Sequence, residues 1–99
     1  MIIVIDNLIS NSLKHGASKV DLTWKQTNEK TISLTYHDNG SGIKSNIIDN
    51  IFEFGFTTSR RGSGIGLYHV KEIIEKMNGK IKANEVEKGA QFLISFKNS

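Results

Sequence analysis

The sequence predicts a two-layer α/β (α+β) fold in which helices pack on a mixed, mostly antiparallel sheet. Two segments, 2–15 and 64–78, repeat apolar residues at the three-to-four spacing of an amphipathic helix. Four shorter segments read as strands: 19–26, 31–37, 80–85 and 91–97. Because these strands come in two consecutive pairs, the order of elements fits two layers better than a doubly wound parallel fold.

The first helix is expected from Ile2 to about His15. Its apolar residues predict a core-facing stripe made of Ile5, Leu8, Ile9 and Leu13. Gly16 follows directly. A glycine at this place ends a helix because it adopts the left-handed conformation without steric cost.

A hairpin is expected next. Segment 19–26 alternates, which predicts a half-buried strand whose inner side carries Val20, Leu22 and Trp24. Residues 28–30 would form the turn. Segment 31–37 would form the second strand, with Ile32, Leu34 and Tyr36 pointing inward.

The second half is expected to begin with a loop over 38–42 and a short helix, capped by Ser45, that runs to about Phe52. A long loop follows. The second long helix is expected to start at Gly64 or Ile65, with an inward face of Leu67, Val70, Ile73, Ile74 and Met77. Asn78-Gly79 would stop it before the last two strands, which are joined through 87–89.

Composition limits the functional classes. The 99 residues fit one domain, and 13 Lys and Arg against 10 Asp and Glu give a net charge of +3. This charge suits an anionic small ligand but is too weak to indicate nucleic acid. The chain has no Cys, which excludes disulfides and thiolate metal sites. No apolar run approaches the roughly 20 residues of a membrane span.

Three short motifs carry the chemistry, and the first lies on the first predicted helix. Asn7 and Asn11 are four residues apart, so both carboxamides project from one face, with Lys14 on the same side. A carboxamide oxygen is a hard, neutral ligand for Mg²⁺, and Lys14 could neutralise a phosphate. Taken alone, these residues are more simply explained as a polar stripe that faces solvent.

The second motif is Asp-Asn-Gly-Ser-Gly at 38–42, directly after a predicted strand. A carboxylate at Asp38 can accept a hydrogen bond from an exocyclic amine, and such a site rejects bases that lack this donor. Gly40 and Gly42 would let a flat ring approach the backbone closely. Taken alone, the segment is more simply explained as a common Asp-Asn-Gly turn.

The third motif is Gly-Ser-Gly-Ile-Gly-Leu at 62–67. Glycines at every second position before a helix expose backbone N–H groups and the positive end of the helix dipole, and both favour an anion. The spacing is neither the dinucleotide fingerprint nor a Walker A loop. A flexible helix start is the alternative, but three glycines in five residues are costly in chain entropy.

The loop between the second and third motifs carries Phe52, Phe54 and Phe56, followed by hydroxyl and arginine residues at 57–61. The aromatic residues could anchor a lid, and the polar residues could reach phosphates. The alternative is that Phe52 belongs to the core and the arginines are solvated.

In their order and spacing the three motifs resemble the N, G1 and G2 boxes of the ATP-binding domain of sensor histidine kinases, within the GHKL superfamily. Residues 51–58 (Ile-Phe-Glu-Phe-Gly-Phe-Thr-Thr) resemble the F box of that family, and 66–73 and 77–81 follow its pattern. The resemblance covers nearly the whole chain. It implies a Bergerat-type sandwich that binds ATP with Mg²⁺.

The resemblance also implies a role for each motif residue. Asn11 would ligate Mg²⁺, Lys14 would contact phosphate, and Asp38 would bind the adenine amino group. Asn7 would be catalytic together with Lys14. The remaining nucleotide-binding positions would be His15, Gly40, Gly42, Ile43, Thr57, Thr58, Arg61, Gly62, Ser63, Gly64, Gly66 and Leu67.

The implied function is that of the catalytic domain of a two-component sensor histidine kinase, which transfers the ATP γ-phosphoryl group to a His on a separate dimerisation domain. Members that hydrolyse ATP have a Glu base at the position of Asn7, and an amide cannot take a proton, which favours transfer. Alternatives are a degenerate or truncated nucleotide-binding or interaction module and a serine kinase of the anti-sigma type. The expected partners are ATP or ADP, the phosphoacceptor domain and a response regulator, without nucleic acid, in the cytoplasm.

The chain departs from the family pattern in three ways. It begins at the N box, so a single domain over 1–99 is expected without the strand and helix that usually come first. The helices with the phosphoacceptor His are absent, so the chain is not expected to autophosphorylate by itself. Ala90 stands where the family often has Thr. A missing strand would leave a bare sheet edge, which predicts self-association.

Overall fold

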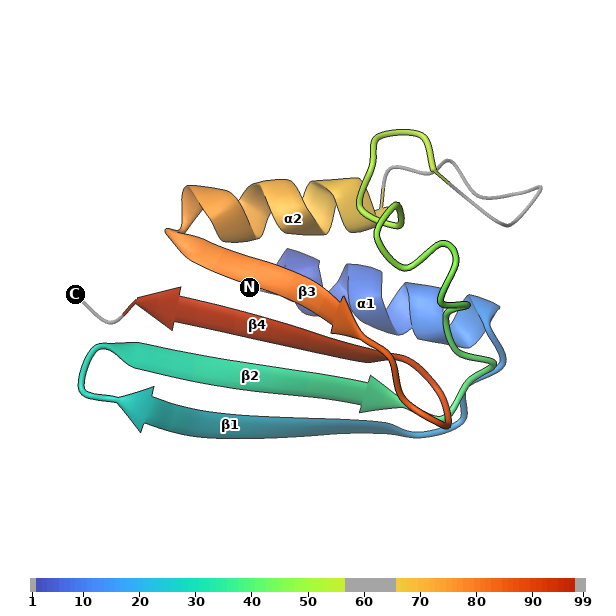
Figure 1. Ribbon diagram of the computed structural model, residues 1–99, viewed down its shortest axis with the longest axis horizontal. Coiled ribbons are helices and arrows are strands. Elements are labelled where there is room, and N and C mark those ends of the chain that lie inside the picture. The colour runs from blue at the N-terminus through green and yellow to red at the C-terminus, as the bar shows by residue number, and fades with distance from the viewer. Residues whose placement is uncertain (1, 57–65, 98–99) are drawn as a thin grey trace.

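The computed structural model describes residues 2–56 and 66–97. Its elements follow in the order α1 (Ile2–Lys14), β1 (Val20–Asn28), β2 (Thr31–Asp38), α2 (Gly66–Lys76), β3 (Gly79–Asn84) and β4 (Gln91–Lys97). The strands form one four-stranded sheet in the order β1-β2-β4-β3 (Figure 1). The predicted two-layer α/β fold is confirmed, and every strand pair in the described sheet is antiparallel.

The core lies between the helices and the two central strands. β2 and β4 place Leu34 opposite Ile94 and Tyr36 opposite Phe92, and all four side chains are fully buried. The helices complete this layer with Val4, Leu8, Val70 and Ile74. Burying an apolar side chain of this size stabilises the fold by about 1.5–3 kcal/mol. The shared core therefore holds both helices on one face of the sheet.

Both long helices end within two residues of the predicted positions. Gly16 has a φ of +79°, and its N–H donates to the carbonyl of Leu13 at 3.1 Å. The N–H of Ala17 donates to the carbonyl of Ser12 at 3.0 Å, which completes a Schellman cap. After α2, Asn78 takes the left-handed conformation with a φ of 59° and turns the chain into β3.

The predicted core stripe of α1 is partly wrong. The buried residues of α1 are Val4, Leu8 and Ser12, whereas Ile9 and Leu13 are 39% and 67% exposed. The apolar spacing of this helix fits two neighbouring stripes, and the sequence pattern does not distinguish them. The stripe that contains a serine faces the core because the Ser12 hydroxyl has buried hydrogen-bond partners there.

The prediction of a half-buried first strand is also wrong. Only Val20 of β1 packs against the core, and Leu22 and Trp24 are 47% and 59% exposed. β1 is an edge strand, and no described helix covers its inner side. The hairpin itself is confirmed, because β1 pairs with β2 in antiparallel register around a turn at 29–30.

The short helix predicted after Ser45 does not form. Residues 44–56 instead make successive turns, closed by N–H groups that bond to the carbonyl three residues earlier. The start predicted for α2 lies outside the described residues, which contain the helix from Gly66 onward. Met77 follows this helix and is 45% exposed, so it does not extend the predicted inward face. The last two strands lie within one residue of their predicted bounds.

Candidate functional site

A buried carboxylate lies where β2 ends. Asp38 is 3% exposed, and its Oδ1 accepts the backbone N–H groups of Gly40 at 2.9 Å and Ala90 at 3.0 Å. Its Oδ2 accepts the hydroxyl of Ser12 at 2.5 Å. An ionised carboxylate offers about four acceptor positions. The three bonds from described residues therefore leave one acceptor position on Oδ2 without a partner among them.

Ser12 and Tyr36 form a buried chain of hydroxyl groups behind this carboxylate. The Ser12 Oγ lies 2.7 Å from the Tyr36 hydroxyl. Because Ser12 has one proton and donates it to Asp38, the Tyr36 hydroxyl donates to Ser12. Sequence reasoning missed this role for both residues, since their contacts join positions 24 and 26 apart. Tyr36 lies on the predicted inward side of its strand, whereas Ser12 is not on the core stripe that the sequence predicts.

This chain of hydroxyl groups gives the protein a pH dependence. Burial raises the pKa of Tyr36 above its usual 10.0, the Ser12 hydrogen bond opposes this rise, and the negative charge of Asp38 adds to it. In the unfolded chain the phenol of Tyr36 has a pKa of about 10, and in the folded protein its pKa is higher. The stabilisation from Tyr36 is therefore fully present below the unfolded pKa of about 10, and it is lost as the pH rises through the folded pKa.

We expect Tyr36→Phe to reduce the loss of stability at alkaline pH, because phenylalanine has no proton to release. The free energy of unfolding of both proteins, measured by urea titration at several pH values from neutral upward, checks this. At neutral pH the variant should be less stable by about 1 kcal/mol, from the lost hydrogen bond. Parallel alkaline profiles for the two proteins would contradict the prediction.

The end of α1 is fastened to the loop that follows Asp38. The carbonyl of His15 accepts the N–H of Ser41 at 2.9 Å. The Asn39 Oδ1 accepts the N–H groups of Ser18 at 2.8 Å and Lys19 at 2.9 Å. The first and second motifs are thus adjacent, as the ATP-site interpretation requires. Asn39 has a structural role in this loop, which agrees with the alternative explanation of residues 38–42 as an Asp-Asn-Gly turn.

Glycines allow two loops to meet under Asp38. Gly89 has a φ of +77°, and a Cβ built on it would lie 1.7 Å from the Asp38 carbonyl oxygen. Gly42 has a φ of +84°, and its Cβ would lie 2.8 Å from the Gly89 carbonyl oxygen. The sequence predicted Gly89 only as part of a connection between strands. The structure makes it the residue that lets the 87–90 connection approach the carboxylate.

The first and third motifs also meet. Asn7 donates its Nδ2 hydrogen to the Ile3 carbonyl at 3.0 Å, and its Oδ1 lies near the start of α2. A Cβ built on Gly66 would lie 3.7 Å from that oxygen. Asn7 and Asn11 are half-buried, so they are not an ordinary solvent-facing stripe, whereas Lys14 is exposed.

The structure describes most of the predicted site residues. Ile43 and Leu67 are half-buried against the edge of the core, and Gly40 lies close to the His15 carbonyl. Six predicted positions lie outside the described residues: Thr57, Thr58, Arg61, Gly62, Ser63 and Gly64. The described part of the site therefore combines the polar side of α1, the loop after β2 and the first turn of α2.

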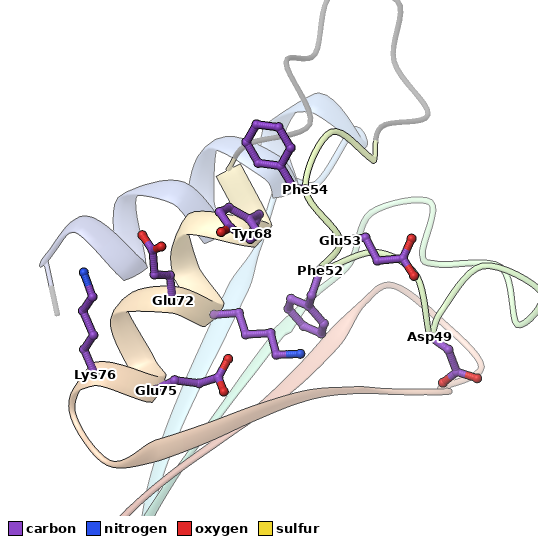
Figure 2. Close-up of a pocket in the computed structure, with 9 residues that line it drawn as sticks. Asp49, Phe52, Glu53, Phe54, Tyr68, Glu72, Glu75 and Lys76 are labelled. Carbon is purple, nitrogen blue, oxygen red and sulfur yellow. The ribbon is translucent and has the colours of Figure 1, made fainter.

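A cavity of about 680 Å³ lies elsewhere, between the 49–54 segment and α2 (Figure 2). Its aromatic lining includes Phe54 and Tyr68, whose rings meet edge to face with centroids 5.1 Å apart. Its charged lining has four acids, Asp49, Glu53, Glu72 and Glu75, against Lys71 and Lys76. This excess of negative charge disfavours a phosphate there. Phe52, which was a lid candidate, packs against Phe92 of the core.

The donor set suits a magnesium ion that arrives with phosphates. Among residues 2–56 and 66–97 no group of three or more His, Asp or Glu could hold a metal. Asn11 offers a single neutral oxygen. Because Mg²⁺ commonly takes one or two protein ligands and fills its shell with waters and substrate phosphates, this one carboxamide is compatible with bound Mg·ATP. In the same described ranges neither helix has the length and apolar character to span a membrane.

The chain matches a known protein family. The family model of histidine kinase-, DNA gyrase B- and HSP90-like ATPases matches residues 1–99. The sensor protein kinase WalK of Staphylococcus haemolyticus is 40% identical over 95 residues, which cover 85% of this chain and 15% of that protein. The sensor histidine kinase GlnK of Bacillus subtilis is 33% identical over 98 residues, which cover 92% of this chain and 24% of that protein.

Solved structures have the same fold. The mycobacterial sensor histidine kinase MprB matches with a TM-score of 0.83 and 24% identity, over 96% of this chain and 68% of that one. A crystal structure of full-length ShkA in complex with AMPPNP matches with a TM-score of 0.81 and 26% identity, over 98% of this chain and 21% of that one. The chain thus spans less than a quarter of the length of the curated kinases that it matches.

Proposed function

We propose that this chain, which belongs to the family of histidine kinase-, DNA gyrase B- and HSP90-like ATPases, is the ATP-binding catalytic domain of a two-component sensor histidine kinase. The reaction would transfer the γ-phosphoryl group of ATP to a histidine on a separate dimerisation domain. A nitrogen of that imidazole would bond to the γ-phosphorus as the bond to the β,γ-bridging oxygen breaks, and ADP would leave. Transfer relies on positioning and charge neutralisation.

The observation that carries this proposal is the buried carboxylate of Asp38. Backbone and hydroxyl donors hold it in one orientation. The adenine amino group would donate to the remaining acceptor position on Oδ2. The glycines beside it let the surrounding loops pack closely against each other and against Asp38, which fixes the position of the carboxylate. The crystal structure of the ShkA relative contains AMPPNP, an ATP analogue, which supports ATP as the ligand here.

Phosphoryl transfer in trans tests the proposal. The chain would be incubated with Mg²⁺, ATP labelled at the γ-phosphate and a purified dimerisation domain of a sensor histidine kinase. We expect acid-labile label on that domain, and none on a copy whose phosphoacceptor His is replaced. Label that depends on neither that His nor Asp38 of this chain would contradict the proposed reaction.

Asn11 is proposed as the protein ligand of Mg²⁺, and Mg²⁺ would neutralise charge on the bound phosphates. We expect removal of Mg²⁺ by EDTA to weaken ATP binding to the wild type by about tenfold, the effect of one lost charge-assisted contact. Asn11→Ala should lower ATP affinity in Mg²⁺ and should respond less to EDTA. Ser10→Ala, an exposed change on the same helix, is the control. Equal Mg²⁺ dependence of both variants would exclude Asn11 as a ligand.

Asn7 favours transfer over hydrolysis, because a carboxamide cannot accept a proton from water. We expect the wild type to release almost no phosphate from ATP, and Asn7→Glu to release it at least about a hundredfold faster, as a positioned base allows. A malachite-green assay checks this, with Asn7→Gln as the control that adds length without a base. Wild-type hydrolysis as fast as that of the glutamate variant would favour a gyrase-like function.

The remaining assignments follow from the proposed function. Lys14, at the exposed end of α1, would contact phosphate. The proposed protein partners are the phosphoacceptor domain and a response regulator that receives the phosphoryl group. The proposed location is the cytoplasm, where a kinase domain finds ATP.

A further inference from the structure

A serine is buried inside a helix where packing alone does not require a hydroxyl group. Ser12 is 1% exposed and lies on the core-facing side of α1 with Val4 and Leu8. Alanine would suit this position better, because it has the higher helix propensity and no polar group that needs a partner when buried. The hydroxyl of Ser12 has two buried partners, which points to a role beyond filling the core.

Both partners of this hydroxyl come from one strand. Tyr36 and Asp38 are two residues apart on β2, so their side chains leave the same face of the sheet. The Ser12 Oγ bridges them, at 2.7 Å from the Tyr36 hydroxyl and 2.5 Å from Oδ2 of Asp38. Ser12 therefore connects the core of the domain to the carboxylate of the proposed adenine site.

The position of the Ser12 hydroxyl is fixed on both sides. The backbone carbonyl of Ser12 accepts the N–H of Ala17 at 3.0 Å, in the cap that ends α1. The ring of Tyr36 is fully buried and meets Phe92 edge to face, with centroids 6.1 Å apart. Because Tyr36 donates to Ser12, the proton of Ser12 is directed at Asp38. The fold thus holds this hydrogen bond to Oδ2 in a constant direction.

The acceptor positions of Asp38 are therefore nearly all assigned. An ionised carboxylate offers about four of them. Oδ1 takes the N–H groups of Gly40 and Ala90, and Oδ2 takes the Ser12 hydroxyl. Counting partners within 2–56 and 66–97, one position remains, and it lies on Oδ2. Without the Ser12 hydroxyl, two neighbouring positions would be open on that oxygen.

We propose that Ser12 is a positioning residue that sets the base specificity of this site, an inference that rests on the proposed ATP-binding function. Adenine presents one donor, its 6-amino group, beside the acceptor nitrogen N1. Hypoxanthine presents the reverse pattern, a carbonyl oxygen beside an N1–H donor. With a single open position in a fixed direction, Asp38 accepts the amino group of adenine and does not accept the displaced N1–H of hypoxanthine.

Removal of the Ser12 hydroxyl opens the second position on Oδ2. Asp38 can then accept either the amino group of adenine or, after a shift of the base, the N1–H of hypoxanthine, so discrimination between the two bases falls. A serine with a purely structural role has a different consequence. Its loss would loosen the site and weaken both nucleotides in parallel, so the ratio of their dissociation constants would stay the same.

Calorimetric titration with Mg·ADP and Mg·IDP measures this ratio. We expect the folded wild type to bind Mg·IDP at least about tenfold more weakly than Mg·ADP, and Ser12→Ala to reduce this ratio at least about fivefold. Ser10→Ala is the matched control, because it removes an exposed hydroxyl from the same helix. It should keep the wild-type ratio.

A second variant guards against a loss of folding. Ser12→Ala alone leaves the Tyr36 hydroxyl without its acceptor, which destabilises the fold. The double variant Ser12→Ala with Tyr36→Phe removes both hydroxyl groups, and replacing both partners of a hydrogen bond by apolar groups can be nearly neutral. We expect this double variant to regain stability in urea denaturation and to keep the reduced ratio.

The outcomes separate this inference from the proposed function. A reduced ratio in both variants, with the wild-type ratio in Ser10→Ala, supports it. A wild type that discriminates between the two nucleotides, with folded Ser12 variants that discriminate equally well, overturns the role of Ser12 and leaves the proposed function intact. A folded wild type that binds neither nucleotide, or both equally, overturns the adenine site and this inference with it.

Discussion

Replacing Asp38 by asparagine is expected to leave the domain folded and to weaken the binding of adenine nucleotides by about 10–100-fold, the loss of one hydrogen bond to a charged group. In the Asp38→Asn variant, the side-chain oxygen could still accept the N–H groups of Gly40 and Ala90. The new amide nitrogen would then replace Oδ2 and present a donor to the adenine amino group. Two donors that face each other cannot bond, so the ligand loses its contact.

The fold tolerates this change because Ser12 can reverse its hydrogen bond. The Ser12 hydroxyl lies 2.7 Å from the Tyr36 hydroxyl, so it can donate there and accept from the new amide. Asp38→Ala is a poorer probe, since it leaves buried donors without an acceptor, each at a cost of about 1–3 kcal/mol. Calorimetric titration with Mg·ADP checks the prediction. A folded Asp38→Asn protein with wild-type affinity would contradict it.

Gly89→Ala is expected to destabilise the protein by about 3–5 kcal/mol, a large share of the roughly 5–15 kcal/mol that holds a typical domain together. The new Cβ would lie 1.7 Å from the Asp38 carbonyl oxygen and 2.7 Å from its carbonyl carbon, so the backbone itself must move. The left-handed φ of +77° adds strain for any residue with a Cβ. Movement here also displaces the carboxylate that would read the base.

Gly16→Ala is the matched control for this change. Gly16 has nearly the same backbone angle, a φ of +79°, but a Cβ built on it meets nothing within 4 Å. Gly16→Ala should therefore lower the free energy of unfolding only by the conformational strain, about 1–2 kcal/mol. Urea denaturation of both variants measures the difference. If Gly89→Ala costs no more than Gly16→Ala, the close approach of the two loops is wrong.

Local signals predicted the elements of this fold well. Gly16 and Asn78 mark the helix ends because left-handed residues are needed there, and both have positive φ. The hairpin of β1 and β2 follows from alternation and a short turn. The first and second motifs also lie next to each other in the fold, since the His15 carbonyl accepts the N–H of Ser41.

Properties that depend on distant parts of the chain were not predictable in this way. Alternation gives the two faces of β1 but not what covers them, so Trp24 was wrongly expected to be buried. The burial of Ser12 depends on Tyr36 and Asp38, which are 24 and 26 residues away. The close contact at Gly89 joins two loops 51 residues apart in the sequence, and only the assembled sheet shows it.

We propose that Asp38 makes this chain a receptor for the adenine base. Calorimetric titration of the folded wild type with Mg·ADP and, in parallel, Mg·IDP tests it most directly, because inosine replaces the amino group with a carbonyl oxygen. We predict micromolar to sub-millimolar binding of Mg·ADP and at least about tenfold weaker binding of Mg·IDP, whose carbonyl would face the carboxylate. Absent or equal binding of the two nucleotides by the folded protein would contradict the account.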